Sequence, residues 1–346
     1  MSLTPEQQMS FGVLALFKNE AGNIAEWINH YLSQGASKIV LVNNGSDDDW
    51  SGQIGESNGA DMVEVLHDNR KHAQVDIYRD ALAGNRFPNE TWLLVCDLDE
   101  FAYARFGYGN IHDYLSRASL KGVGAIMLPW KSFGSSGFNR QPRGVRESFL
   151  YRATAPFPEP HPGYSRGKYL CRIGYTHDLC VHHPILRKGK YILSTGRDIS
   201  RHSDLIRLGY VPNSEKQQAL SVLHLNHYPV QSRDYFFNIK AKRGDAYFKT
   251  PRLQTKDNSY FNKFNKNDVF DDELSRLTGK QTSRHNLESS QYEAFKALSK
   301  KDHFIKKQLR LAKRRAVIDT AQSIGFTLSL SDFISRARHC GETTLE

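Results

Sequence analysis

The chain has 346 residues, of which 39% are hydrophobic and 24% are charged, and its formal net charge is +10. This composition indicates a soluble globular protein with one large domain or two smaller ones, and it argues against a disordered chain. The positive surplus favours anionic partners such as nucleotides, nucleic acid, acidic glycans or anionic lipid. Residues 1–10 lack the apolar core of a signal peptide, and no two of the four cysteines form a CxxC pair. We therefore expect a cytoplasmic protein with free thiols.

The first 130 residues alternate between short β-rich runs and helix-like segments. Strands are predicted at Phe11–Phe17, Lys38–Asn43, Met62–Leu66, Thr91–Cys96 and Ala125–Trp130. Helices are predicted at Ala25–Gln34, His72–Asn85 and Ile111–Ala118, where apolar residues recur at helical spacing. This alternation predicts an α/β fold with a mostly parallel sheet and helices on both faces.

The amino-acid composition changes after residue 130. Residues 131–201 are rich in Gly, Pro, Ser and His, which predicts a loop-rich half covering a cleft. A short strand at Val222–Leu225 precedes an amphipathic helix, and residues 270–338 read as helical and basic. We divide the chain into a catalytic domain at 1–245, with a donor half at 11–130 and an acceptor half at 131–245, and a basic helical region at 246–346.

A basic amphipathic helix is predicted around residues 300–316. Its apolar face holds Phe304, Ile305, Leu309, Ala312 and Ala316, and lysine and arginine fill much of the remainder. Such a helix either lies on an anionic membrane surface or packs on the domain with its charges in water. The sequence is therefore consistent both with peripheral contact to an anionic membrane and with packing of this helix on the domain.

Polar side chains follow each of the first four predicted strands. The exits are Lys18-Asn19-Glu20, Asn43-Asn44-Gly45-Ser46-Asp47-Asp48, His67-Asp68-Asn69-Arg70 and Asp97-Leu98-Asp99-Glu100. In open α/β sheets, ligands bind outside the carboxyl ends of the strands. The four exits together therefore predict a ligand site at this edge.

Asp97 and Asp99 stand two residues apart just after an apolar strand. In an extended backbone both carboxylates point to the same side. Two hard oxygen ligands at a strand end suit Mg²⁺ or Mn²⁺, which completes its shell with water and substrate phosphates. The alternative is a solvated acidic turn or a helix N-cap.

Three stretches resemble one family of enzymes. The run LVCDLDEF is similar to the DxD strand of GT-A glycosyltransferases, and residues 17–48 resemble the opening of family 2 and family 92-like members. The matching positions there are Lys18-Asn19-Glu20, Trp27 and His30-Tyr31. Leu225–Ser232 resembles the late HY-x-x-x-S segment, with Lys240 and Arg243-Gly244 following. The resemblance covers about residues 11–245. Asn43-Asn44 replaces the acids that many family 2 enzymes carry after strand two, which leaves the nucleotide base open.

The resemblance implies a GT-A, Rossmann-like fold and an inverting, metal-dependent transfer from a nucleoside-diphosphate sugar to a hydroxyl of a glycan or glycolipid. It implies Mn²⁺ or Mg²⁺ as cofactor, held by Asp97, Asp99 and His227. Histidine is a natural third ligand for Mn²⁺, although His227 is equally consistent with a structural role. The expected donor-binding residues are Asn19, Glu20, Asn43, Asp48, Asp68, Gln74, Arg233, Lys240 and Arg243. The last three suit diphosphate, and the alternative for them is a solvated helix face.

The general base that takes the acceptor proton is expected in the acceptor half. Glu147 follows the loop after strand five and is the first candidate, with a surface ion pair to Arg143 or Arg146 as its alternative. His183 is the second candidate. The pair His182-His183 before Pro184 is also consistent with phosphate or metal binding by one of the two, or with a structural role.

Two other classes of function compete with glycosyl transfer. A nucleotidyltransferase also uses paired acids and a metal, but it usually needs a glycine-rich basic loop after strand one, where this chain has Lys18-Asn19-Glu20-Ala21. A non-catalytic basic protein that binds glycan or nucleic acid is the other class. We expect no nucleic-acid partner, because the basic residues are not organised around an aromatic platform.

Overall fold

The computed structural model describes residues 9–154, 161–243 and 256–278. The described residues belong to one compact unit, Met1–Lys280, and the second unit, Gln281–Glu346, lies outside them. The basic helix expected around residues 300–316 therefore falls outside the description. The expected boundary between residues 245 and 246 also falls in a stretch that is not described, and it stays a prediction.

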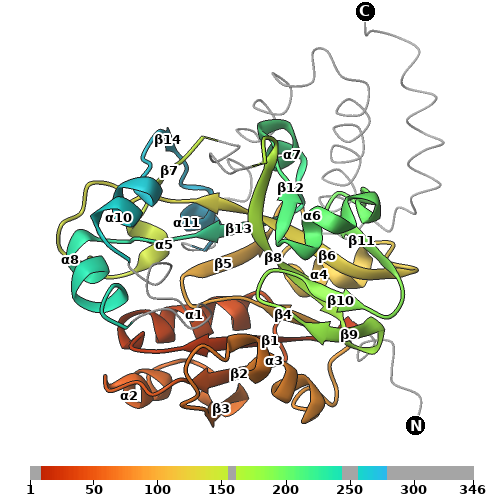
Figure 1. The fold of residues 1–346 in the computed structure, drawn as a ribbon, viewed down its shortest axis with the longest axis horizontal. Coiled ribbons are helices and arrows are strands. Elements are labelled where there is room, and N and C mark those ends of the chain that lie inside the picture. The colour runs from red at the N-terminus through yellow and green to blue at the C-terminus, as the bar shows by residue number, and fades with distance from the viewer. Residues whose placement is uncertain (1–8, 155–160, 244–255, 279–346) are drawn as a thin grey trace, which may run out of the picture. The chain divides into compact units, whose positions relative to one another are not determined.

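A mixed sheet forms the centre of the unit, with the strand order β3-β2-β1-β4-β8-β6-β13-β5 (Figure 1). The first four strands are parallel neighbours: β1 (Phe11–Phe17), β2 (Lys38–Asn43), β3 (Val63–His67) and β4 (Trp92–Val95). All residues of β1 and β4 are buried. A strand covered on both faces reads as a continuous apolar run, which is why the sequence located these strands so closely.

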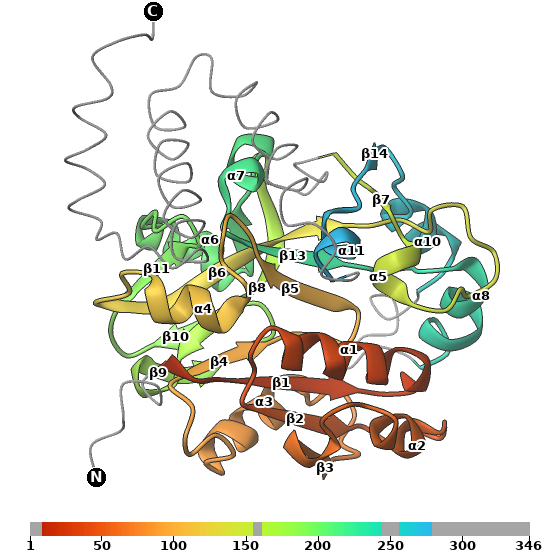
Figure 2. The ribbon, with the colours of Figure 1, turned by 180° about the vertical axis from the view of Figure 1, so that it is seen from behind.

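Helices cover both faces of this parallel half. Alternate residues of β1 divide between two cores: Phe11, Val13 and Ala15 pack with α1 (Ala21–Ser33) and α4 (Ile111–Arg117), whereas Leu14 and Leu16 pack with α3 (Gln74–Ala83). This is the period of two that a strand imposes on its side chains. Figure 2 shows α1 and α4 together on the near face. The predicted α/β fold and its three helices are confirmed.

A strand that the sequence analysis did not predict enters the sheet next to β4. The antiparallel β8 (Tyr164–Arg172) lies between β4 and β6 (Val123–Ser132). Residues 131–201 thus supply a nine-residue central strand in place of loops alone. A Cβ on Gly167 would stand 2.2 Å from the Leu128 carbonyl oxygen, so this glycine permits the close approach of β8 to β6.

One strand brings a distant part of the chain close to the turn that follows β4. β5 (Glu100–Ala104) comes directly after this turn, and β13 (Leu223–His227) lies between β5 and β6. The register places His227 opposite Glu100. The chain then turns through α8 (Arg233–Tyr235) into a π-helix, η5 (Phe236–Lys240). The strand that the sequence predicted at Val222–Leu225 is confirmed, and it extends two residues further.

Short elements complete the unit. They are α2 (Trp50–Gly55), η2 (Ala60–Met62), α5 (Val145–Ser148), β7 (Tyr151–Arg152), η3 (Ile173–Tyr175), β9 (Thr176–Leu179), β10 (Pro184–Leu186), β11 (Lys190–Leu193), η4 (Ser200–His202), α6 (Ser203–Arg207), β12 (Tyr210–Pro212), α7 (Glu215–Leu220), α10 (Asn258–Phe264), β14 (Val269–Phe270) and α11 (Glu273–Thr278). β11 pairs with β6, and β12 pairs with β8.

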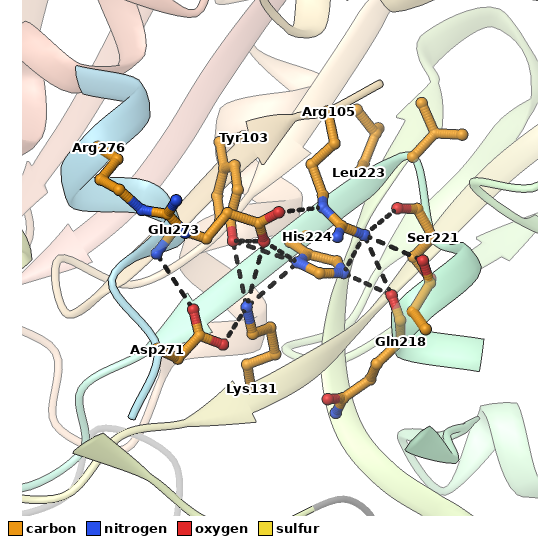
Figure 3. Close-up of polar contacts among 12 residues, drawn as sticks. Tyr103, Arg105, Lys131, Gln218, Ser221, Leu223, His224, Asp271, Glu273 and Arg276 are labelled. Carbon is orange, nitrogen blue, oxygen red and sulfur yellow. Dashed lines mark hydrogen bonds and ion pairs between the residues drawn. The ribbon is translucent and has the colours of Figure 1, made fainter. Parts of the chain in front are cut away.

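The segment formed by α10, β14 and α11 is held to the sheet by buried charges (Figure 3). Lys131 on β6 pairs with Asp271 at 2.7 Å, and Arg105 after β5 pairs with Glu273 at 2.6 Å. Tyr103 donates a hydrogen bond to Glu273, 2.8 Å away. We call these residues, together with His224 of β13, the strap cluster.

The described residues contain no helix that combines the length and the apolar character needed to cross a bilayer. Their three cysteines, Cys96, Cys171 and Cys180, form no disulfide.

Candidate active site

A cavity of about 940 Å³ opens at the carboxyl ends of β1, β2 and β4, the edge at which the sequence predicted a ligand site. Its lining includes Lys18, Asn44, Asp97 and Asp99 from these ends, and Trp130 from β6. The rest of the lining includes residues of β8, α6, β12, β13, η5 and α10 and of the turn between β9 and β10.

The turn that carries the two aspartates is held from behind by α1. The Trp27 indole donates hydrogen bonds to the carbonyl oxygens of Asp97 and Glu100, at 3.0 and 3.1 Å. The Tyr31 hydroxyl donates to the Glu100 carbonyl and accepts from the Ala102 amide, both at 3.0 Å. The tryptophan and tyrosine that carry the family resemblance thus fix the backbone of the turn, and their side chains stay fully buried.

Lys168 on β8 supports Asp97 from within the sheet. Its ammonium lies 2.9 Å from Oδ2 of Asp97 and 3.6 Å from Oε2 of Glu100, and its side chain has no exposed surface. Burial opposes the charge of Lys168, but the two carboxylates outweigh that effect and raise its pKa. Burial raises the pKa of Glu100 to about 8, because the protein interior solvates its charge poorly. Asp97, with a side chain 34% exposed, is therefore the acid of this pair that faces the cavity.

Asp99 has a different lysine. Oδ2 of Asp99 is paired with Lys240 of η5, and Oδ1 lies 3.8 Å from Nε2 of His227. Burial alone would favour the neutral carboxyl, but the Lys240 ammonium holds the pKa of Asp99 below its usual range. Burial also lowers the pKa of His227 to about 4, so its imidazole is neutral at physiological pH. We call Asp97, Asp99, Lys168 and Lys240 the turn cluster.

A third ion pair lies in the cavity wall beside the end of β1. Arg243 pairs with Glu20, and it also donates a hydrogen bond to the Lys18 carbonyl oxygen at 3.0 Å. Asn23 donates to the same Glu20 carboxylate at 2.8 Å. The turn after β1 is thus fixed by a residue more than 200 positions later, and Lys240 and Arg243 reach the cavity together.

The predicted site residues fall into two groups. Those that line the cavity are Glu20, Gln74, Asp97, Asp99, His183, His227, Lys240 and Arg243. Those that do not are Asn19, Asn43, Asp48, Asp68, Glu147 and Arg233.

Four residues of the second group are engaged in the loops that shape the site. Oδ1 of Asn19 accepts from the Asp47 amide at 3.0 Å, and Oδ1 of Asn43 accepts from the Ser46 amide at 2.8 Å. Asp48 accepts from the Ala21 amide at 2.7 Å, at the start of α1. Asp68 forms an ion pair with Arg70. Their side chains organise the backbone, so the structure does not bring them to the cavity wall.

Glu147 and Arg233 lie away from the cavity. Glu147 is exposed on α5, and Arg233 is exposed at the start of α8, where its guanidinium stacks on Phe237 at 5.0 Å. The loop after β6 carries α5 toward α1 instead of over the cavity, because Glu26 of α1 accepts hydrogen bonds from the amides of Val145 and Arg146 at 2.6 and 3.1 Å.

Several residues of the cavity wall carry no recognisable signal in the sequence. Lys168 and Arg166 lie on β8, where apolar and polar residues do not alternate, so neither periodicity nor a motif marked them. Trp130 lies with its ring 4.1 Å from that of His227 and donates to Glu100 at 2.6 Å. The sequence predicted the apolar strand that ends at Trp130, but it did not predict that Trp130 contributes to the site.

The donor types at the turn suit a hard divalent cation. Oδ1 of each aspartate is the oxygen that no lysine holds, and the neutral His227 ring stands beside Asp99. Within the described ranges, no three His, Cys, Asp or Glu side chains already form a group arranged to hold an ion. Asp97, Asp99 and His227 share one cavity wall, and their chemistry fits Mn²⁺ or Mg²⁺.

The model of glycosyltransferase family 92 matches residues 8–199, which is more than half of the chain. The chain belongs to glycosyltransferase family 92. The match includes α1, the turn with Asp97 and Asp99, and Lys168, and it ends before β13 and η5. Family membership places this chain among the enzymes that transfer sugars, and it confirms the resemblance seen in the sequence.

Solved structures of nucleotide-sugar enzymes overlap with this family 92 chain in part. A mannosyltransferase from Pyrobaculum calidifontis, in complex with GDP-Man and Mn²⁺, is 17% identical, covers 34% of each chain and has a TM-score of 0.28. TarS 1-349 from S. aureus in complex with UDP-GlcNAc is 19% identical over 48% of this chain and 46% of its own, with a TM-score of 0.30.

A putative glucose-1-phosphate thymidylyltransferase from Bacillus anthracis also overlaps, at 10% identity over 48% of this chain and 72% of its own, with a TM-score of 0.30. The chain thus spans about a third to a half of the length of the two transferases. No curated protein matches the chain.

Proposed function

We propose that this family 92 protein transfers a sugar from a nucleoside-diphosphate sugar to a hydroxyl of a glycan or glycolipid, with inversion and with a divalent metal. The observation that carries the proposal is the meeting of Asp97, Asp99 and His227 with Lys240 and Arg243 on one cavity at the carboxyl edge of the sheet. At this edge of the sheet, the acids would hold the metal ion and the cations would bind the diphosphate of a nucleotide-sugar donor.

The donor half of the cavity supplies two kinds of contact. Glu20, Asn44 and Gln74 offer acceptors and donors near the ends of β1 and β2, where a nucleoside binds in folds of this kind. Lys240 and Arg243 supply positive charge for the diphosphate, and Arg243 is held in place by Glu20. Positive charge fixed in advance stabilises the negative charge that develops on the leaving diphosphate.

Asp97, Asp99 and His227 would hold Mn²⁺ or Mg²⁺, which when bound acts as a Lewis acid on the diphosphate. Lys168 and the α1 residues behind the turn hold the two carboxylates in position. Removing Asp97 or Asp99 would therefore remove charge from the site, whereas removing Lys168 would disturb the orientation of Asp97.

His183 is the residue that we place as general base. It lines the cavity, whereas Glu147 does not. Burial, with Arg207 and Arg166 nearby, lowers the pKa of His183 to about 4, so the ring is unprotonated and able to accept a proton at neutral pH. The acceptor oxygen bonds to C1 as the bond from C1 to the diphosphate oxygen breaks. The bonding electrons leave with the diphosphate, and the hydroxyl proton passes to His183.

The remaining expectations follow the same proposal. We propose a cytoplasmic protein, and peripheral contact with an anionic membrane through residues 300–316 is a part of the proposal that the described residues do not reach.

The test is incubation of the full chain with a panel of nucleotide-sugars, with Mn²⁺ or with a chelator, followed by identification of the released nucleotide. We expect a nucleoside diphosphate that appears only with the metal and the correct donor. Released pyrophosphate would indicate nucleotidyl transfer. A chain that binds the nucleotide and releases nothing with any donor, with acceptor glycans present, would overturn the enzymatic proposal.

A further inference from the structure

One wall of the cavity is basic and comes from elements other than those that carry the proposed donor residues. It is formed by Arg166 of β8, by His182 and His183 of the turn between β9 and β10, by Arg207 of α6 and by Tyr210 of β12. The acids in the lining of the cavity are Glu20, Asp97 and Asp99, which come from the ends of β1 and β4. Among the described residues, therefore, no acid of the lining belongs to this wall.

The side chain of Arg166 is held in a fixed position. Its Nη1 donates to the Leu208 carbonyl oxygen at 2.8 Å, and its guanidinium stacks on the Tyr210 ring at 4.5 Å. Gly209 between these two residues has φ +80°, and a Cβ there would stand 2.8 Å from both Nη1 of Arg166 and Cβ of His182. The wall is thus a built arrangement, because the glycine makes room for the arginine and the histidine at once.

The positive charge of this wall has no internal counterion in the part of the chain that the structure describes. Each acid of the cavity is already paired: Glu20 with Arg243, Asp97 with Lys168 and Asp99 with Lys240.

Asp178, the acid that acts electrostatically on His183, is paired with Arg79 at 2.8 Å. Neither Arg166 nor Arg207 forms an ion pair with any described acid. Two guanidinium groups on one cavity wall suit a ligand with a planar or tetrahedral anion, since each presents a fork of donors.

We propose that this wall is an acceptor subsite for an anionic group, a carboxylate or a phosphate carried by the acceptor sugar. The inference rests on the proposed function, since it assigns the donor to the residues at the ends of β1, β2 and β4 and to Lys240 and Arg243. The proposed function assigns the donor diphosphate to Lys240 and Arg243, which line the cavity as partners of Asp99 and Glu20. An anion held between Arg166 and Arg207 would place the sugar beside His183, the residue that takes the hydroxyl proton.

The experiment measures binding of simple sugars to the full chain, saturated with Mn²⁺ and with UDP or GDP, by ligand-observed NMR. The probes are glucuronate, glucose 6-phosphate and glucose, which share a ring and differ in charge. We expect one or both anionic sugars to bind at least about tenfold more tightly than glucose, a difference in free energy of about 1.4 kcal/mol. The carboxylate and phosphate arms separate the two sources of the anion.

Variants test the two arginines directly. Arg166→Gln and Arg207→Gln should each bring the anionic sugar close to the affinity of glucose while leaving the affinity for the nucleoside diphosphate unchanged. The matched control is Arg201→Gln, which removes an exposed arginine of η4 that does not line the cavity.

Equal binding of charged and neutral sugars would overturn the inference. A loss of nucleotide affinity in Arg166→Gln equal to its loss of sugar affinity would also overturn it, because the arginine would then serve the donor diphosphate. If no nucleotide binds but the anionic sugars still bind through Arg166 and Arg207, the proposed function fails and the anion site stands.

Discussion

Two buried groups of charges lie on the same sheet and serve different ends. The turn cluster pairs two aspartates with Lys168 and Lys240 on the wall of the cavity. The strap cluster pairs Asp271 and Glu273 with Lys131 and Arg105, and none of these residues lines the cavity. The ion pairs are similar in kind, but only those of the first group face a space that a substrate can enter.

The difference teaches how access decides the role of a buried ion pair. In the strap cluster every partner is supplied by the fold, and Lys131 and Glu273 gain nothing from a ligand. In the turn cluster, each lysine contacts Oδ2 of its aspartate. The lysines therefore stabilise the buried carboxylates, and Oδ1 of each aspartate remains for a ligand. We therefore expect changes in the strap cluster to affect stability and changes in the turn cluster to affect activity.

The largest effect is expected from Glu273→Gln. Removing one partner of a buried ion pair leaves the others uncompensated, which typically costs about 3–5 kcal/mol. The free energy of unfolding, measured in urea, should fall by about that amount, while the folded enzyme keeps its turnover. Glu56→Gln, at an exposed acid, is the control. Unchanged stability would show that the strap is not held by these charges.

Asp99→Asn should show the opposite pattern. The change removes an anionic ligand and nearly preserves shape, so we expect release of nucleoside diphosphate to slow by about 10²–10³-fold, the size typical of losing one preorganised electrostatic contact. The far-ultraviolet circular dichroism should be retained. Asp204→Asn on α6 removes an exposed acid outside the cavity and should leave turnover unchanged. Normal turnover of Asp99→Asn at limiting Mn²⁺ would contradict the metal assignment.

His183→Gln should slow the chemical step and spare the donor. A general base acts only as the acceptor proton moves, so we expect kcat to fall by about 10²-fold with little change in donor affinity. Glu147→Gln is the matched control, because Glu147 is exposed on α5. If kcat falls for Glu147→Gln and not for His183→Gln, the base lies in α5.

His227→Ala should weaken binding of Mn²⁺ with nucleoside diphosphate by at least about tenfold, as expected for a change at a metal site. Isothermal calorimetry measures this affinity. The control is His177→Ala, since His177 is exposed on β9 and does not line the cavity. Equal affinity in His227→Ala and in the unchanged protein would make His227 a structural residue.

The smallest effect concerns pH and the strap cluster. Burial, with Arg105 and Lys131 nearby, lowers the pKa of His224 to about 4 from an ordinary value of 6.5. Between pH 6.5 and pH 4 the unfolded chain then binds a proton that the folded chain does not, so stability falls as the pH falls through this window. In His224→Gln the slope of unfolding free energy against pH should decrease by about one proton. An unchanged slope would show that His224 does not contribute.

The sequence by itself determined the elements whose signals are local. Phe11–Phe17 and Lys38–Asn43 were located to the residue, because strands buried on both faces are continuous apolar runs bounded by polar exits. The Asp97–Asp99 pair, the helix that supports it and the late His227 segment were visible as short motifs. These parts lie in or beside the region that the family model covers.

Only the tertiary structure decided which residues meet. Lys168 reaches Asp97 because β8 inserts antiparallel beside β4, and Lys240 reaches Asp99 through a π-helix 141 positions away. Glu26 of α1 accepts a hydrogen bond from the Val145 amide, which holds α5 and its Glu147 near α1. The Arg166 guanidinium stacks on Tyr210 in the space that Gly209 leaves. Such partners are chosen by strand order and by the pairing of buried charges, and neither leaves a periodic trace in the chain. The sequence therefore predicted the polar residues at the carboxyl ends of the strands. It did not predict Lys168 as the partner of Asp97, or the basic wall around Arg166 and Arg207.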